Sequence, residues 1–386
     1  MQADADISAL HYGSWSGRLS PEWVSTIVPD ETAINLKSGS VLNARARMSY
    51  DKAENRLVID GQGSVFGSGS RDPRPQGTAT SPRSSLGAVL WEGYGENQQG
   101  NWRFSLGKRA FDFSSALLTS PSNPALSGLS LVSPLLPQEG LWNGWVQWLP
   151  SEKYALQVGT AVSQTSATSL LAPFLRFSAN FNAVDTWTVA ANRFLGWGAN
   201  WQARESLLIY GEGNLNQTRF SLPGESELHS DWLFGSQWSP GLWGMKLTLE
   251  YFRNGYGLAG SASSQRRKAL GQLRGDTRAR VYSFPAPANF ASPTAGIGSF
   301  FSRDLLFADL RSESLGSTPF LTAMGSLNDA SLLSILGYRW TLSSSSDDGW
   351  GLTLEWRRFS GLEGSEFGEA AHQVGANQFW ITFALR

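Results

Sequence analysis

Hydrophobic and polar residues alternate along the whole chain in segments of roughly ten residues. In segment 154–163, for example, Leu156 and Val158 alternate with Gln157 and Gly159. Because successive side chains of a β-strand point to opposite faces, each segment predicts a strand with one apolar and one polar face. The predicted strands are 8–16, 41–50, 56–67, 85–95, 101–109, 141–149, 154–163, 169–180, 185–193, 196–203, 206–215, 229–238, 244–254, 299–311, 317–327, 331–341, 349–359 and 374–385.

The connections between these strands sort by length. If the last strand runs toward the periplasm, the short turns fall on that side, at 51–55, 96–100, 150–153, 181–184, 204–205, 239–243, 312–316 and 342–348. The long connections fall on the other side, at 17–40, 68–84, 110–140, 216–228, 255–298 and 360–373. This sorting is typical of an up-and-down antiparallel transmembrane β-barrel. We therefore predict an all-β fold in which residues 1–386 form one barrel of about 18 strands, with 16 strands as the alternative.

The composition agrees with a barrel wall that faces lipid on one side and water on the other. Charged residues make up 16% of the chain, against about 25% in typical soluble proteins. Aromatic residues reach 12%, and many of the 17 Trp lie near predicted strand ends, where membrane interfaces favour them. No segment approaches the ~20 consecutive apolar residues of a transmembrane helix. A net charge of −1 argues against binding to nucleic acid.

The last ten residues, 377–386, carry a family resemblance. Phe379, Ile381, Phe383 and Leu385 alternate as in the C-terminal assembly signal of outer-membrane barrels, although this chain ends on Arg386 where that family usually ends on Phe or Trp. The chain resembles the large outer-membrane porins and exporters of Gram-negative bacteria, and in size it is similar to monomeric alginate-exporter barrels. The resemblance implies a location in the outer membrane, contact with lipid and lipopolysaccharide, and recognition by the barrel-assembly machinery through the last strand.

The predicted inward row contains more arginine than carboxylate. A guanidinium group pairs well with carboxylates and phosphates, so an arginine-lined lumen favours anions. The alternative is that arginine–carboxylate ladders only stabilise the barrel, and the pattern favours neither interpretation. The candidate lumen residues are Arg45, Arg47, Arg103, Arg109, Arg176, Arg339, Glu355 and Arg357.

Two long connections are candidates for gating elements. Connection 255–298 is strongly basic, with Asp276 as its only acid, and could fold inward as a constriction or meet anionic lipopolysaccharide. Connection 110–140 is rich in Ser, Leu and Pro and nearly uncharged, so it is unlikely to lie free in water and could plug the lumen or cap the rim. An apolar plug would suit a hydrophobic substrate. The cationic residues of the first connection are Arg266, Arg267, Lys268, Arg274, Arg278 and Arg280.

Catalysis finds little support in the sequence. The run His229-Ser230-Asp231 places His229 and Ser230 on opposite faces of a strand, so they cannot act together as base and nucleophile. His229 and Asp231 share a face, where a rim hydrogen bond is the simpler interpretation. No metal-ligand spacing is present, and no cofactor is predicted.

These observations favour a passive channel or export pore, not an enzyme, for polar, anionic solutes, either small molecules or a polysaccharide. Three alternatives stay open. The barrel could be a conduit that sheathes a periplasmic or secretion partner, a transporter of hydrophobic substrates plugged by connection 110–140, or an outer-membrane hydrolase.

Overall fold

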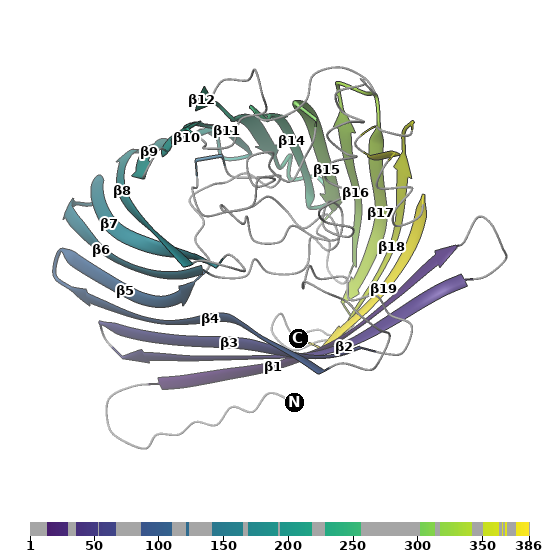
Figure 1. Ribbon diagram of the computed structural model, residues 1–386, viewed down its shortest axis with the longest axis horizontal. Helices are drawn as coiled ribbons and strands as arrows, with labels where there is room; N and C mark the ends of the chain where they lie inside the picture. The colour runs from purple at the N-terminus through teal and green to yellow at the C-terminus, as the bar shows by residue number, and fades with distance from the viewer. Residues whose placement is uncertain are drawn as a thin grey trace.

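One antiparallel β-sheet closes on itself in the computed structural model of the chain (Figure 1). Strand β1 (Ser14–Pro29) pairs with both β2 (Leu36–Lys52) and β19 (Asn377–Leu385), so the first and last strands join. The structure describes residues 14–29, 36–52, 54–66, 86–109, 121–122, 141–164, 169–191, 194–217, 228–255, 302–312, 317–341, 350–362, 365, 367–368 and 376–385.

Neighbouring strands in the chain are neighbours in the sheet throughout. The strands between β2 and β19 are β3 (Asn55–Phe66), β4 (Leu86–Gln99), β5 (Trp102–Arg109), β6 (Leu141–Ser151), β7 (Tyr154–Gln164), β8 (Ser169–Phe181), β9 (Val184–Ala191), β10 (Phe194–Arg204), β11 (Leu207–Gln217), β12 (Leu228–His229), β13 (Trp232–Trp238), β14 (Met245–Arg253), β15 (Asp304–Ser312), β16 (Ser317–Ser326), β17 (Leu332–Thr341) and β18 (Trp350–Ser360). Among the described residues, no helix is long and apolar enough to cross a membrane.

The short strand β12 and its neighbour β13 both pair with β11, so together they form one interrupted strand. Within the described ranges, the 19 strand segments, less this one interruption, make 18 strands, in agreement with the predicted number of about 18. The start of β1 and the end of β19 lie at the same end of the barrel, because Ser14 is opposite Asp51 and Leu385 is opposite Trp350. The predicted all-β barrel is confirmed.

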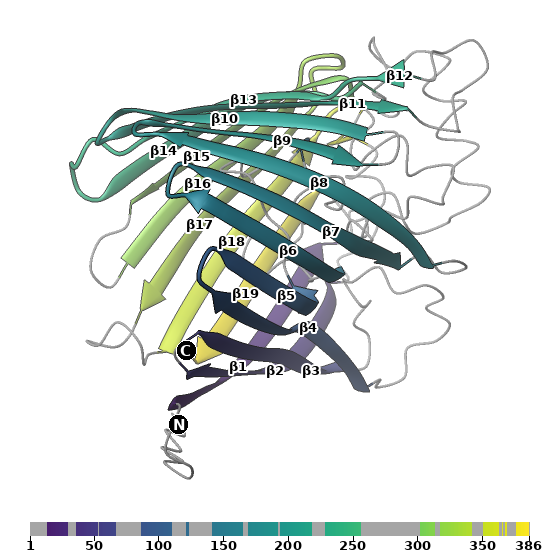
Figure 2. The same ribbon diagram turned by 90° about the vertical axis from the view of Figure 1, so that its left-hand side faces the viewer.

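The connections sort between the two ends of the barrel only in part as predicted, because the end with the long connections also carries short ones such as 192–193 and 327–331. At one end the connections are tight turns such as 152–153 and 182–183, and the longest spans 342–349. At the other end lie the long connections, including 110–140 and 254–303. Figure 2 shows the strands running side by side and slanting around the wall between these two ends.

The first predicted strand, 8–16, and the first predicted loop, 17–40, were wrong. Strand β1 occupies most of that loop and pairs with β2 from Ser14 to Pro29. Residues 8–13 lie outside the described part of the chain. Strand β1 contains Pro21 and ends at Pro29, and a proline is tolerated in a strand wherever its missing N–H is not needed by the sheet.

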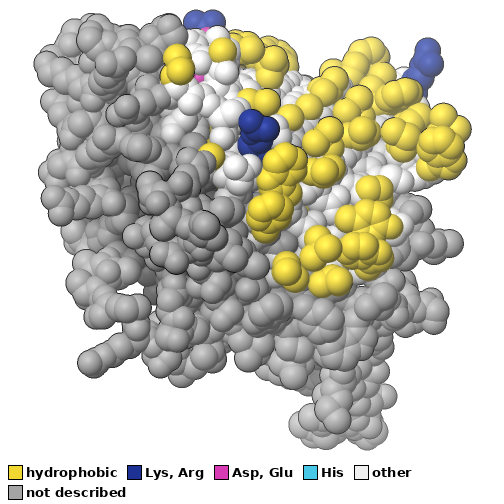
Figure 3. Space-filling view, turned by 90° about the vertical axis from the view of Figure 1, so that its right-hand side faces the viewer, with side chains coloured by type: hydrophobic (Ala, Val, Ile, Leu, Met, Phe, Trp, Pro, Cys, Tyr) yellow, Lys and Arg dark blue, Asp and Glu magenta, His cyan; other side chains and the backbone are white. Residues whose placement is uncertain are grey.

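The outer face of the barrel is apolar. Across β15 to β19, one outward residue of each strand stands opposite the outward residue of the next strand. All five residues of this row are large and hydrophobic, and their exposed fractions range from 36% to 54%. Figure 3 shows hydrophobic side chains gathered in a broad band over the described part of this side, with few charged groups among them. The row consists of Leu310, Leu321, Leu336, Trp356 and Phe379. Such a band fits the hydrocarbon core of a bilayer.

The inner face is only partly polar, whereas the sequence pattern predicted a uniformly polar row. On β6 to β9, Trp145, Phe174, Trp187 and Val189 form a buried apolar cluster that alternates with exposed outward residues. Further around the wall, buried apolar side chains occupy the inward row of β13 to β18 near the long connections: Leu233, Phe252, Leu305, Phe307, Leu333, Ile335 and Phe359. In the described part of the inner wall, aqueous surface is therefore confined to some of the strands.

A lysine substitution at two neighbouring positions, one on each face, should lower the free energy of unfolding by very different amounts. Leu321 faces outward near the middle of β16, whereas the hydroxyl of Thr322 faces inward and donates to Asp309 Oδ1 at 2.6 Å. We expect Leu321→Lys to lower the free energy of unfolding by about 2–4 kcal/mol, the cost of a lysine at the bilayer midplane. Thr322→Lys, placed beside a carboxylate, should cost far less. Urea unfolding of the barrel folded into lipid vesicles measures both, and equal losses would contradict the assignment of the faces.

Candidate functional site in the barrel lumen

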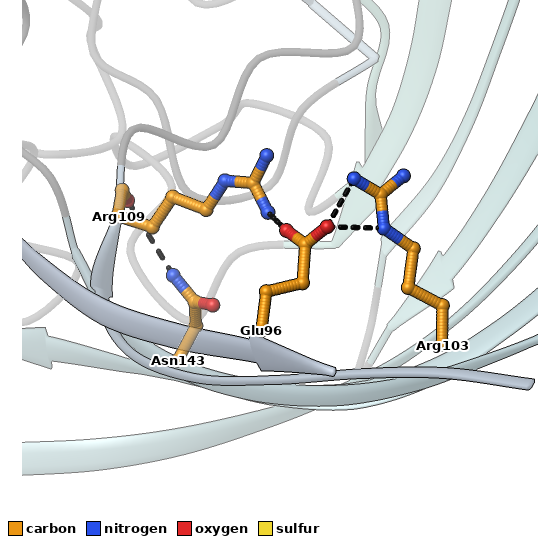
Figure 4. Close-up of polar contacts among 4 residues, drawn as sticks. All are labelled: Glu96, Arg103, Arg109 and Asn143. Carbon is orange, nitrogen blue, oxygen red and sulfur yellow. Dashed lines mark hydrogen bonds and ion pairs between the residues drawn. The ribbon is translucent and has the colours of Figure 1, made fainter. Parts of the chain in front are cut away.

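A cluster of charged residues lies on the inner face of β4 and β5. Alternation along β5 places Arg103, Ser105 and Arg109 on one face, and Ser105 stands opposite Glu96 of β4 in register. The Glu96 carboxylate therefore lies between the two guanidinium groups (Figure 4). Arg103 donates to Glu96 Oε1 through Nε and Nη2, and Arg109 Nη1 donates to Glu96 Oε2 at 2.7 Å.

Aromatic rings and an amide hold Arg109 in place. Its guanidinium carbon lies 4.6 Å from the ring centre of Tyr94 and 5.8 Å from that of Trp145. The guanidinium carbon of Arg103 lies 6.0 Å from the same Trp145 ring. Asn143 Nδ2 donates to the backbone oxygen of Arg109 at 3.4 Å. Cations placed over aromatic rings are attracted to them, so this wall favours the charged arginines in one position.

Within this cluster, the one carboxylate of Glu96 is shared by the two guanidinium groups of Arg103 and Arg109. Further charges adjoin it, from Glu92 on the same face of β4 and from Arg56, which stands opposite Glu96 in β3. The side chain of Glu96 is only 9% exposed, whereas those of Arg103 and Arg109 are 36% and 26% exposed. The cations thus face the solvent of the lumen while the carboxylate lies beneath them.

Arg357 and Glu355, two other predicted lumen residues, form a balanced pair. Arg357 Nε and Nη2 donate to Glu355 Oε2 at 3.0 and 2.5 Å, and both side chains are 2% exposed. Their charges cancel and are shielded from water. This pair belongs to the type of ladder that stabilises a wall.

The remaining predicted residues are spread around the barrel. Arg176 lies in β8 opposite Gln157 and Val189. Arg339 lies in β17, opposite Thr318 and Thr353. Arg45 and Arg47 lie in β2, and their side chains are outside the described part of the structure. The same holds for all six cationic residues predicted in connection 255–298: Arg266, Arg267, Lys268, Arg274, Arg278 and Arg280.

A segment of connection 110–140 is anchored to the inner wall. Ser122 is fully buried, and its backbone N and its hydroxyl donate to Glu212 Oε2 of β11 at 3.3 and 2.7 Å. The same hydroxyl accepts a hydrogen bond from Trp187 Nε1 of β9 at 2.9 Å. Two residues along β11, Asn214 Nδ2 donates to the backbone oxygen of Pro121 at 2.8 Å. The connection between β5 and β6 therefore reaches the wall formed by β9 to β11.

Two glycines of β10 make room for this anchor. A Cβ atom at Gly196 would lie 2.6 Å from the backbone oxygen of Ser122, and one at Gly198 would lie 2.2 Å from the Trp187 ring. Neither position tolerates a side chain while Ser122 and Trp187 stay where they are. The wall is thus shaped to receive the segment.

Sequence reasoning missed Glu96, Glu212 and Asn214. Glu96 was assigned to the predicted turn 96–100, whereas β4 continues to Gln99. Glu212 and Asn214 lie on the inward row of predicted strand 206–215, and polar residues spaced by two among the glycines of that strand were a usable signal. Their partner Ser122 lies 90 residues from Glu212 in the chain, and no local pattern relates the two.

Comparison with known proteins identifies the fold. The sequence matches no protein-family model and no curated protein. Among solved structures, OccAB1 of Acinetobacter baumannii is 11% identical, with a TM-score of 0.57, and the match covers 100% of this chain and 99% of that one. OccK8 (OprE) of Pseudomonas aeruginosa is 10% identical, with a TM-score of 0.56 and 96% and 97% of the two chains covered. A BenF-like porin of Pseudomonas fluorescens Pf-5 is 9% identical, with a TM-score of 0.54 and 96% and 97% covered.

These likenesses define the class of fold. The chain folds like the outer-membrane porins of Gram-negative bacteria over nearly its whole length. The predicted barrel class agrees with this fold, as does the predicted place in the outer membrane.

The anchor at Ser122 can be tested by conductance. Ser122→Ala removes the hydroxyl bonds to Glu212 and from Trp187, and a hydrogen bond to a charged group contributes about 1.5–3 kcal/mol. We expect the segment to detach more often, so that brief changes in single-channel current become several-fold more frequent. Ser334→Ala, on the outer row of β17, is the matched control. Identical current noise in the wild type and in Ser122→Ala would show that the anchor does not restrain the segment.

Proposed function

We propose that the protein is a passive channel of the outer membrane through which small anionic solutes diffuse. The observation that carries this proposal is the cluster of Arg103, Arg109 and Glu96, in which two lumen-facing cations share one recessed carboxylate. A low-dielectric wall strengthens the field of such a charge inside a narrow lumen. Anions would therefore be concentrated beside β4 and β5.

The chemistry of arginine points to carboxylates and phosphates as the preferred solute groups. Each guanidinium carries five N–H donors in a planar fork, more than the shared Glu96 can accept. A passing carboxylate can bind the outer donors of Arg103 or Arg109 and then leave, because Glu96 already holds the arginines in position. Weak, multiple contacts of this kind allow a solute to enter without being trapped.

The anchored segment Pro121–Ser122 supports a narrow diffusion channel over the alternatives. A conduit for a protein partner needs a lumen without inward segments, whereas this segment lies on the inner wall. A plug for hydrophobic substrates would bury apolar contacts, whereas Ser122 is held by a carboxylate and an indole N–H. We keep the passive channel as the proposal.

The hydrolase alternative depends on His229 and Asp231. The two carboxylate oxygens of Asp231 accept hydrogen bonds from the backbone N of Gly255 and from Asn214 Nδ2. The side chain of His229 lies outside the described part of the structure.

The proposed location defines further partners. The apolar outer row would contact lipid, and the rim at the long connections would meet lipopolysaccharide. The final strand, β19, would present its alternating apolar residues to the barrel-assembly machinery. Constriction by the cationic residues of connection 255–298 stays a prediction, as does a periplasmic partner.

Charge reversal tests the proposed selectivity. We expect Arg103→Glu combined with Arg109→Glu to lower the chloride-to-potassium permeability ratio by about tenfold, the lower end of the effect of a charged cleft on local ion concentration. The reversal potential of the channel in a KCl gradient measures this ratio. The control is Arg204→Glu, which makes the same change of sign at the exposed turn between β10 and β11.

The outcomes separate the two interpretations of the arginines. A shift in the double variant without a shift in Arg204→Glu supports a selectivity role for the cluster. An unchanged reversal potential in a correctly folded double variant means that Arg103 and Arg109 only stabilise the wall.

A further inference from the structure

The interruption between β12 and β13 contains no inserted residue. Instead, a side-chain oxygen accepts the hydrogen bond that a backbone oxygen would accept in a continuous strand pair. Asn216 stands opposite His229 and Gly213 opposite Trp232, so the register is the same on both sides of the interruption. Between them, the backbone N of Asp231 donates to the side-chain oxygen of Asn214 at 3.2 Å. The backbone N of Asn214 in turn donates to the backbone oxygen of Asp231 at 3.0 Å. Asn214 and Asp231 thus form a local junction in the sheet.

The Asp231 carboxylate fixes the beginning of connection 254–303. Its Oδ1 accepts a hydrogen bond from the backbone N of Gly255 at 2.7 Å, just beyond the end of β14. Gly255 packs so closely on the interruption that an added Cβ atom would lie 2.4 Å from the backbone oxygen of Ser230. The chain therefore leaves β14 in contact with the junction.

The Asn214 amide fixes connection 110–140 from the same junction. Its Nδ2 donates to Asp231 Oδ2 at 2.9 Å and to the backbone oxygen of Pro121 at 2.8 Å. Asn214 is 4% exposed, so both bonds are made away from solvent. Three consecutive hydrogen bonds, Gly255 to Asp231, Asn214 to Asp231 and Asn214 to Pro121, link the two connections.

We propose that Asp231 and Asn214 are positioning residues that couple connection 254–303 to connection 110–140. The seat of Pro121 depends on the orientation of the Asn214 amide, and that orientation depends on Asp231, which also holds Gly255. Loosening either connection should therefore loosen the other. Coupling of this kind is reciprocal, because a change at one site alters the second by the same factor as the reverse. The proposal rests on the proposed channel function and deepens it, since both connections are the candidate gating elements of the sequence.

Hydrogen–deuterium exchange of the detergent-solubilised full chain tests the coupling without requiring conductance. We expect Asp231→Ala to speed amide exchange several-fold in peptides from 254–303 and also in peptides from 110–140. Ser122→Ala should speed exchange in the same two regions. Peptides from β16 and β17 should exchange as in the wild type, because a local junction does not alter the far wall.

The matched control is Asp185→Ala. Asp185 also accepts a hydrogen bond from an asparagine, Asn180 Nδ2, but it does so at the tight-turn end of β8 and β9. This variant should leave both connections unchanged. If Asp231→Ala fails to fold, Asp231→Asn preserves its size while turning an amide toward Asn214, and it should give a smaller increase of the same pattern.

The proposal is overturned if each variant speeds exchange only in its own connection, or if Asp231→Ala behaves like Asp185→Ala. Its failure can be told apart from failure of the channel function. If the two connections exchange independently in a channel that prefers anions, the coupling proposal fails and the proposed function stands. If the connections are coupled but the barrel conducts no current, the channel proposal fails and the coupling proposal stands.

Discussion

Closure of the sheet by the pairing of β1 with β19 is the constraint on which the rest of the structure depends. A sheet edge in lipid would leave backbone N–H and C=O groups without partners, and each would cost several kcal/mol. Closure removes the edge and fixes an even number of strands when both ends of the wall lie on one side. It also leaves every second side chain facing outward, where Leu321 and Leu336 must be apolar.

The inner row then becomes the only place where this chain can put charge within the membrane. Much of the row is occupied by buried apolar side chains, and one charge pair, Arg357 with Glu355, is balanced and shielded. Glu96 is different because it holds two arginines at once. The arginine cluster on β4–β5 and the site on β9–β11 that holds Ser122 are separated by strands β6 to β8. The wall thus carries a charged surface and an anchored inward segment at different places around the barrel.

The strands and their order could be predicted from the sequence because lipid and water impose a strict alternation on each strand. The exception was β1, which spans Ser14–Pro29, whereas the predicted strand was 8–16. Arg103 and Arg109 were found because they lie on the inward row of a strongly alternating strand. Their shared partner Glu96 was not, because the end of β4 was placed too early.

Contacts between distant segments lay beyond prediction for a physical reason. The bonds of Ser122 to Glu212 and of Asn214 to Pro121 join parts of the chain that are about a quarter of its length apart. Neither pair has a periodic signal, since an irregular segment can approach any part of the inner wall. The sequence of connection 110–140 indicated that it could plug the lumen or cap the rim, but not which side chains would hold it. Which side chains receive it depends on the space left by Gly196 and Gly198.

The most direct test of the central claim is the current through single wild-type channels in a planar bilayer under a KCl gradient. An open lumen with the Arg103 and Arg109 cluster on its wall predicts a stable conductance and a reversal potential displaced toward that of chloride. Absence of conductance would contradict an open channel, and a reversal potential displaced toward potassium would contradict anion selectivity from this cluster.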